Sequence, residues 1–197
     1  LRLALERSTT AGEAVAIIGE LIERYGQGGS CEEHSFRTYH NSYIVADPGS
    51  AWIVETAGHR WIAQRVTDRA AIGNMLTIHD EWDAASPGIV EHARETGWSS
   101  GSFDFAAAYQ DPDADLAPRA CRRDRARAIL GGYREPITVE QMMDVLRDHD
   151  GRGLPTTGEP LPTLCMHARP GFPGDTAAAM VAHLKPNQPR ELTATVW

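Results

Sequence analysis

The chain has 197 residues, 42% hydrophobic and 23% charged, which is typical of a globular protein with a sizeable core. Its net charge of −8, and a basic run at 119–127 that Asp124 interrupts, argue against a nucleic-acid-binding face. No apolar run approaches the roughly 18 residues of a membrane span, and the three cysteines have no paired spacing. We therefore expect a cytoplasmic protein that binds neither nucleic acid nor membrane.

The first clear element is a helix that begins after Thr10. Thr10 and Glu13 have the spacing of a capping box, in which each side chain bonds the backbone of the other residue. Apolar residues then recur at helical spacing up to Tyr25, and Gly26 ends the helix. Residues 1–7 also show a helix-like pattern and are expected to end a preceding helix.

Four short strands follow, predicted over residues 42–46, 51–56, 60–66 and 70–75. The turn between the first two is Asp-Pro-Gly-Ser, in which Pro48 restricts φ and Gly49 tolerates a positive φ. Because the connections are short, these strands are predicted to form an antiparallel meander that is covered on at least one face.

The rest of the chain contains helices and then strands. The helices are predicted over residues 87–96 with Ser86 as the cap, 122–130, and 138–148 with a capping box of Thr138 and Gln141. Residues 101–118 are polar and expected to be irregular. The strands are predicted over 161–168, 176–184 and 192–197. Strands that are segregated from helices predict an α+β fold.

Cys165 and His167 are expected on the same face of a strand. They are compatible with a catalytic Cys/His pair, with a partial metal site, or with a buried cysteine beside a hydrogen-bonded histidine. We favour the last interpretation, because two metal ligands without a third are a weak signal. Cys31 follows two glycines in a flexible stretch, which does not suit a catalyst that needs a held geometry.

A second polar cluster, His79, Asp80, Glu81 and Asp83, follows the fourth predicted strand. A metal site is one interpretation. A solvated loop is the favoured one, because adjacent residues rarely converge on one ion outside specialised loops.

Asn74 is a polar residue in a stretch that is otherwise small or apolar. Its carboxamide can donate to a developing negative charge without titrating, which is the property of an oxyanion donor. The alternative is an Asn that ends a strand and bonds the backbone of a turn.

Three segments together resemble the central sheet of secernins and of dipeptidase-type cysteine N-terminal-nucleophile (Ntn) hydrolases. They are residues 39–48 (Tyr-His-Asn-Ser-Tyr-Ile-Val-Ala-Asp-Pro), 51–58 (Ala-Trp-Ile-Val-Glu-Thr-Ala-Gly) and 71–78 (Ala-Ile-Gly-Asn-Met-Leu-Thr-Ile). The motif Thr-Leu-Cys-Met-His-Ala at 163–168 extends the resemblance, which covers most of the chain and is weaker over 101–136.

The resemblance implies a four-layer αββα sandwich with antiparallel sheets, incomplete here, in which residues 1–197 are the central part of a single domain. It implies amide hydrolysis by a Cys at the mature N-terminus, with the α-amino group of that Cys as the base. Asn74 matches an Asn that helps to hold the oxyanion in related acylases, and Thr77 and His167 are the expected substrate-binding residues. Leu1 is not a Cys, so we expect an inactive internal fragment whose nucleophile lies outside the chain.

The expected substrates are peptides or N-acyl small molecules, and no cofactor or metal ligand is assigned. Sheet edges left unpaired in an incomplete sandwich are compatible with a homo-oligomer or with a poorly stable fragment. The alternative function is a secernin-like regulatory or binding protein without hydrolytic activity. A third hypothesis is a metal-dependent hydrolase that uses His79, Asp80 and His167.

Overall fold

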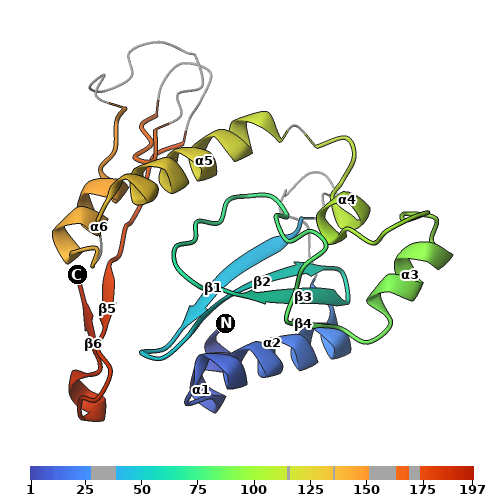
Figure 1. Cartoon of the computed structure of the whole chain (residues 1–197), viewed down its shortest axis with the longest axis horizontal. Helices are drawn as coiled ribbons and strands as arrows, with labels where there is room; N and C mark the ends of the chain where they lie inside the picture. The colour runs from blue at the N-terminus through green and yellow to red at the C-terminus, as the bar shows by residue number, and fades with distance from the viewer. Residues whose placement is uncertain (28–38, 115, 135, 151–162, 169–173) are drawn as a thin grey trace. The chain divides into compact units, whose positions relative to one another are not determined.

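The computed structural model of the chain describes residues 1–27, 39–114, 116–134, 136–150, 163–168 and 174–197 (Figure 1). The chain divides into two compact units, Leu1–Asp68 with Ile72–Ala114, and Arg69–Ala71 with Asp115–Trp197. Each unit contains helices and an antiparallel sheet. This combination confirms the predicted α+β class.

The first unit is built on a four-stranded antiparallel sheet in the order β1–β2–β3–β4. Its strands are β1 (Asn41–Ala46), β2 (Ala51–Ala57), β3 (Arg60–Arg65) and β4 (Ala84–Ala85). Its helices are α1 (Arg2–Arg7), α2 (Ala11–Tyr25), α3 (Ile89–Glu95) and α4 (Phe105–Tyr109). The first three strands and the antiparallel meander are as predicted from the sequence.

Helix α2 forms as the capping pattern predicts. The Glu13 backbone N–H donates to Thr10 Oγ1 at 3.2 Å, and the Glu13 carboxylate accepts from the Thr10 N–H at 3.3 Å. Gly26, with φ of 71°, ends the helix. Gly19 faces the sheet so closely that a Cβ there would lie 2.4 Å from the Trp61 ring. The absence of a side chain at this position therefore lets α2 approach β3.

The alternation of residues along the strands gives the sheet two buried faces. On one face, which α2 covers (Figure 1), Trp52, Val54 and Ala63 pack against apolar residues of the helix. On the opposite face, Ile62 packs in a separate cluster with Phe105 and other residues of α3, α4 and the 76–78 segment. Burial on both faces explains why β2 and β3 carry few exposed residues.

The predicted fourth strand at 70–75 is wrong. The position beside β3 is taken instead by residues 83–86, where the Asp83 N–H donates to Ala63 O and the Ser86 N–H donates to Trp61 O, both at 2.9 Å. The backbone that follows residue 75 bonds to side chains rather than to a strand. The Leu76 N–H, for example, donates to Gln110 Oε1 at 2.9 Å.

Helices α3 and α4 also differ from the sequence prediction. Helix α3 begins after Gly88, whose φ is 67°, and not at the predicted cap Ser86. Ser86 is buried, and its Oγ accepts from the Trp61 N–H at 3.3 Å. Helix α4 lies in the stretch that was expected to be irregular. Asp104 caps it by accepting from the Ala107 N–H at 2.8 Å, and it buries Phe105 in the core.

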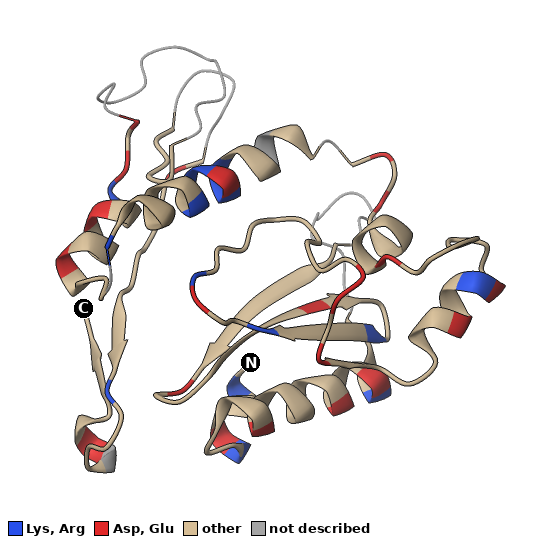
Figure 2. Cartoon of the chain, in the orientation of Figure 1, with Lys and Arg blue, Asp and Glu red and all other residues tan. Residues whose placement is uncertain are grey.

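The second unit contains α5 (Ala117–Gly132), α6 (Val139–Leu146) and a hairpin of β5 (Ala182–Leu184) with β6 (Ala194–Val196), linked by a 3₁₀ turn (Arg190–Leu192). The predicted capping box of Thr138 and Gln141 is confirmed. Helix α5 carries the interrupted basic run, in which Asp124 is the one acidic residue among arginines (Figure 2). Within the described ranges, no helix has both the length and the apolar character needed to cross a bilayer.

The strands predicted near the C-terminus are longer than the observed ones. Residues 161 and 162 lie outside the described ranges, and 163–168 form no strand. Here the Met166 N–H donates to Thr176 Oγ1 at 2.8 Å, and Met166 O accepts from the Thr176 N–H at 2.9 Å. Because a side-chain oxygen replaces one backbone acceptor, the pairing does not continue as a ladder.

The turn between β1 and β2 is tied to the start of α2 by Asp47. One carboxylate oxygen of Asp47 accepts from the N–H groups of Gly49 and Ser50 at 2.6 and 2.7 Å, and the other accepts from the Ala11 N–H at 2.7 Å. These backbone hydrogen bonds, led by the one from Ala11, hold the pKa of the Asp47 carboxyl below its usual value. Asp47 therefore links the β1–β2 turn of the sheet to the first turn of α2.

We predict that Asp47→Ala lowers the free energy of unfolding by about 1–2 kcal/mol at neutral pH, since it removes a helix-end acceptor and two turn bonds. A folded-state pKa below the unfolded value of about 3.9 means that the stabilisation is complete above that pH and is lost as the pH falls through the folded pKa. The difference in unfolding free energy between wild type and Asp47→Asn, measured in urea, should therefore shrink below about pH 4. A difference that does not change with pH would contradict this.

Candidate functional site

Asn74 lies in a bend, and not at the end of a strand as expected. The bend belongs to the first unit and is flanked by an isolated antiparallel bridge between Gly73 and Met75. The Asn74 residue is exposed, whereas Leu76 and Ile78, which follow it, are buried. A polar side chain is therefore presented at the surface by a segment whose other end is part of the core.

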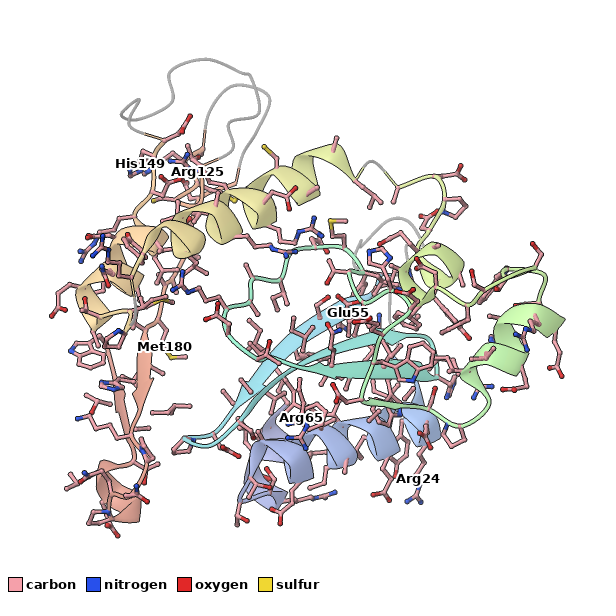
Figure 3. The ribbon with its side chains drawn as sticks, viewed as in Figure 1. Arg24, Glu55, Arg65, Arg125, His149 and Met180 are labelled. Atoms are coloured by element: carbon pink, nitrogen blue, oxygen red, sulfur yellow. The ribbon has the colours of Figure 1, made fainter. Side chains whose placement is uncertain are left out.

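Glu55 anchors this segment to the sheet. It lies on β2 and is fully buried (labelled in Figure 3), and its carboxylate accepts from three donors of the segment. The Thr77 N–H donates at 2.8 Å, the Thr77 Oγ1 hydroxyl at 2.7 Å and the Ile78 N–H at 3.0 Å. A buried carboxylate is tolerated when such donors replace its hydration.

Two further side chains hold the same segment. Ser42 Oγ on β1 donates to Met75 O at 3.4 Å, and Gln110 Oε1, just after α4, accepts from the Leu76 N–H at 2.9 Å. Residues 75–78 are therefore bonded to β1, β2 and the end of α4. A catalytic donor needs this kind of support, because a displacement of about 1 Å can remove most of its effect.

Sequence reasoning missed Glu55 and identified Thr77 without its partner. The available signal was a single carboxylate within the otherwise uncharged strand Ala-Trp-Ile-Val-Glu-Thr-Ala, since acidic residues are rarely fully buried unless paired. The Thr77 hydroxyl donates to Glu55. A hydroxyl oxygen still has acceptor capacity after donating its proton, so this bond leaves Thr77 able to accept from another group.

The cluster after the bend has the character of a solvated loop. His79 Nδ1 lies 2.8 Å from the Asp104 carboxylate, which also caps α4, and Asp83 accepts from the Arg65 N–H at 2.7 Å. Asp80 and Glu81 are exposed. Each of these partners is local to the first unit, and this geometry favours the loop interpretation over a metal site.

Tyr109 is a titratable residue in the core beneath α3. Burial raises its pKa to about 12. Its hydroxyl donates to Ile89 O at 3.0 Å and lies 2.9 Å from His92 Nδ1, and its ring stacks on Phe105 with the centroids 4.8 Å apart. Tyr109 therefore remains protonated near neutral pH and joins α3 to α4.

His167 belongs to the second unit, in a different environment from Asn74 and Thr77. Its Nε2 lies 3.5 Å from Cys165 Sγ, so the predicted proximity of this pair is confirmed, although the two residues are not in a strand. The structure adds His149, whose Nε2 is 2.9 Å from His167 Nε2. No local pattern relates His149 to the later motif, because their proximity depends on tertiary structure.

The cysteines differ in their surroundings. Cys121 is exposed on α5, Cys165 is half-buried beside His167, and both are free thiols. Cys31, the third cysteine, lies outside the described residues. A thiolate nucleophile needs a base together with oxyanion donors about 3 Å from the reacting atom. Of the two described thiols, Cys165 is bonded to a potential base.

The chain is similar to known proteins over almost its whole length. The probable dipeptidase A of Streptococcus pyogenes serotype M1 is 27% identical over 229 aligned residues, which cover 99% of this chain and 46% of the relative. The probable dipeptidase A of Streptococcus pyogenes serotype M3 (strain SSI-1) is also 27% identical, with 99% and 47% covered. The chain thus spans about half the length of the curated relatives it matches.

A family model for peptidase family C69 matches residues 1–119. The match includes α1 to α4, the four-stranded sheet and the bend that carries Asn74. It covers more than half of the chain and contains the whole first unit. The chain therefore belongs to peptidase family C69.

Proposed function

We propose that the chain is part of a cysteine-dependent amide hydrolase of the dipeptidase class, acting on peptides or N-acyl small molecules. The support is its membership of peptidase family C69, together with relatives that are named probable dipeptidases. The proposed nucleophile is an N-terminal Cys in the portion of the protein that this chain does not include. The chain spans about half of those relatives, which is compatible with a nucleophile elsewhere.

The observation that carries this proposal is the anchored bend at Asn74. In the proposed mechanism, the nucleophile attacks the amide carbonyl, and the Asn74 carboxamide donates a hydrogen bond to the oxygen that becomes negative. Such a donor is effective when it is held before the reaction begins, because no reorganisation is then needed. The bonds from Glu55, Ser42 and Gln110 to residues 75–77 supply that constraint.

Thr77 and His167 remain the proposed substrate-binding residues. Thr77 follows Asn74 by three residues in the anchored segment and retains acceptor capacity for a substrate N–H. His167 is proposed on the strength of the family motif at 163–168, and its neighbours in the structure are His149 and Cys165.

The proposed architecture is an Ntn-type αββα sandwich, of which residues 1–197 form the central part of one domain. The proposal is supported by the antiparallel sheet of the first unit with α2 on one face, which would form one helical layer and one sheet layer of such a sandwich. The free thiols Cys121 and Cys165 suit the proposed cytoplasmic location, where thiols stay reduced. Association through unpaired sheet edges remains part of the proposal.

For the full-length parent, we predict that Asn74→Ala lowers kcat about 10²- to 10³-fold, the usual effect of removing one oxyanion donor. Dipeptide hydrolysis under saturating substrate measures the change. Asp80→Ala, at an exposed position in the same loop, is the matched control and should retain turnover. Near-wild-type kcat in the Asn74 variant would refute its role, and loss of activity in the control would favour the metal-dependent alternative.

We predict that Glu55 acts as a positioning residue. Glu55→Gln presents an amide N–H₂ to backbone donors and should lower the unfolding free energy by about 1–3 kcal/mol. In the parent it should lower kcat with little change in KM, because the bend that holds Asn74 loosens. The paired variants Thr77→Ser and Thr77→Val test the hydroxyl that donates to Glu55, since Ser keeps it and should restore the kcat that Val loses. Because Thr77 is also a proposed substrate contact, loss of that contact is read separately as a rise in KM. Equal kcat in the two Thr77 variants would exclude the positioning role.

The 197-residue chain alone is predicted to show no peptidase activity. Thiol-dependent cleavage of a dipeptide by the purified chain, abolished by Cys165→Ser, would overturn the proposal that the nucleophile lies elsewhere. A full-length parent that has no N-terminal Cys after processing would instead support the secernin-like binding protein.

A further inference from the structure

We propose that His149, Cys165 and His167 form a zinc-binding site in the second unit. One ligand atom from each residue, two imidazole nitrogens and one sulfur, lies within 4.8 Å of the others. All three side chains are half-buried. Sequence reasoning assigned no metal here because it found two candidate ligands, and the fold supplies the third from a distant segment. This site does not rest on the proposed oxyanion role of Asn74, although it includes His167, which is also a proposed substrate-binding residue.

Two of the three distances between ligand atoms are close to those of tetrahedral zinc, and the third, between Cys165 and His149, is within 4.8 Å. Zinc bonds of about 2.05 Å to nitrogen and 2.3 Å to sulfur place a nitrogen and a sulfur roughly 3.5 Å apart and two nitrogens roughly 3.3 Å apart. Cys165 Sγ lies 3.5 Å from His167 Nε2, and the two Nε2 atoms are 2.9 Å apart. The two Nε2 atoms are at hydrogen-bond distance, and the ring centroids are 5.1 Å apart. Tetrahedral zinc would require these nitrogens to move about 0.4 Å apart and the rings to turn so that both nitrogens face the ion.

His149 is held by an ion-paired turn. Arg125 on α5 donates to both carboxylate oxygens of Asp148, at 3.1 and 2.7 Å, and its third nitrogen lies 2.8 Å from Asp150 (Arg125 and His149 are labelled in Figure 3). Asp150 has a positive φ of 56°, which makes the turn sharp. The residues on either side of His149 are therefore fixed to the same guanidinium, which limits the movement of the imidazole.

Cys165 and His167 are held by hydrogen bonds to other segments of the second unit. The Cys165 N–H donates to Asp148 O at 3.2 Å, so this segment is bonded directly to the turn that carries His149. The Ala168 N–H donates to Asp175 Oδ1 at 2.6 Å. Outer contacts of this kind orient metal ligands, and their loss typically weakens metal affinity about 10- to 100-fold.

A pocket of about 610 Å³ gives an ion access to two of the ligands. Cys165 and His167 line it, together with apolar side chains that include Met143, Leu146 and Val181. Three protein ligands leave the fourth tetrahedral position open, and the pocket has room for a water molecule there. Thiolate and imidazole ligands select zinc over magnesium or calcium, which require oxygen ligands.

The test uses the 197-residue chain and zinc or cobalt alone. Titration with Zn²⁺ in competition with a chromophoric chelator should give one site per chain. Cobalt substitution should produce a thiolate-to-cobalt absorption band. Cys165→Ser, His149→Ala and His167→Ala should each weaken zinc binding at least about 100-fold, since a direct ligand matters more than an outer contact. Cys165→Ser should also abolish the cobalt band.

The matched controls are Cys121→Ser and His183→Ala, which change an exposed cysteine and an exposed histidine elsewhere in the same unit. Both should bind zinc like wild type. Circular dichroism of each variant separates loss of ligand from loss of fold. The cobalt band is measured on the wild-type chain, so this test does not depend on whether a variant folds. Absence of the band from the folded wild-type chain overturns the proposal. Zinc affinity that survives all three ligand substitutions, or that falls equally in the controls, also overturns it.

Discussion

The buried carboxylate of Glu55 is the interaction on which the first unit depends. It lies on β2, an inner strand of the sheet, and accepts hydrogen bonds from the backbone N–H groups of Thr77 and Ile78 and from the Thr77 hydroxyl. These bonds satisfy backbone N–H groups that have no partner in a strand. They also offset the free-energy cost of removing the carboxylate from water. A segment that would otherwise be a loop is thereby fixed across the face of the sheet.

This constraint links the core to the proposed chemistry. The segment buries Leu76 and Ile78 against α3 and α4, and its preceding bend places Asn74 at the surface. The same bonds therefore complete a hydrophobic cluster and hold a carboxamide ready to bind negative charge. Electrostatic catalysis is effective when its donors are preorganised in this way. The family membership supplies the peptidase class, and the geometry supplies a physical reason for the importance of this position.

In the second unit, the positively charged guanidinium of Arg125 has a role comparable to that of the Glu55 carboxylate. It donates to Asp148 and pairs with Asp150, on either side of His149. The hydrogen bonds from Arg125 hold the pKa of the Asp148 carboxyl below its usual value. The backbone of Asp148 then accepts from Cys165. One ion-paired turn thus brings together two histidines and a cysteine whose chemistry favours a soft or borderline metal.

The sequence alone determined the elements whose residues interact with near neighbours along the chain. The capping boxes at Thr10 and Thr138, the Asp-Pro-Gly-Ser turn and the first three strands form as predicted, because their hydrogen bonds join residues close in sequence. The motif around Asn74 indicated the family. Tertiary structure alone decided that 70–75 is not a strand, that Glu55 anchors Thr77, and that His149 meets Cys165 and His167. These outcomes depend on which distant group satisfies a buried donor or charge, and a local pattern carries no information about that partner.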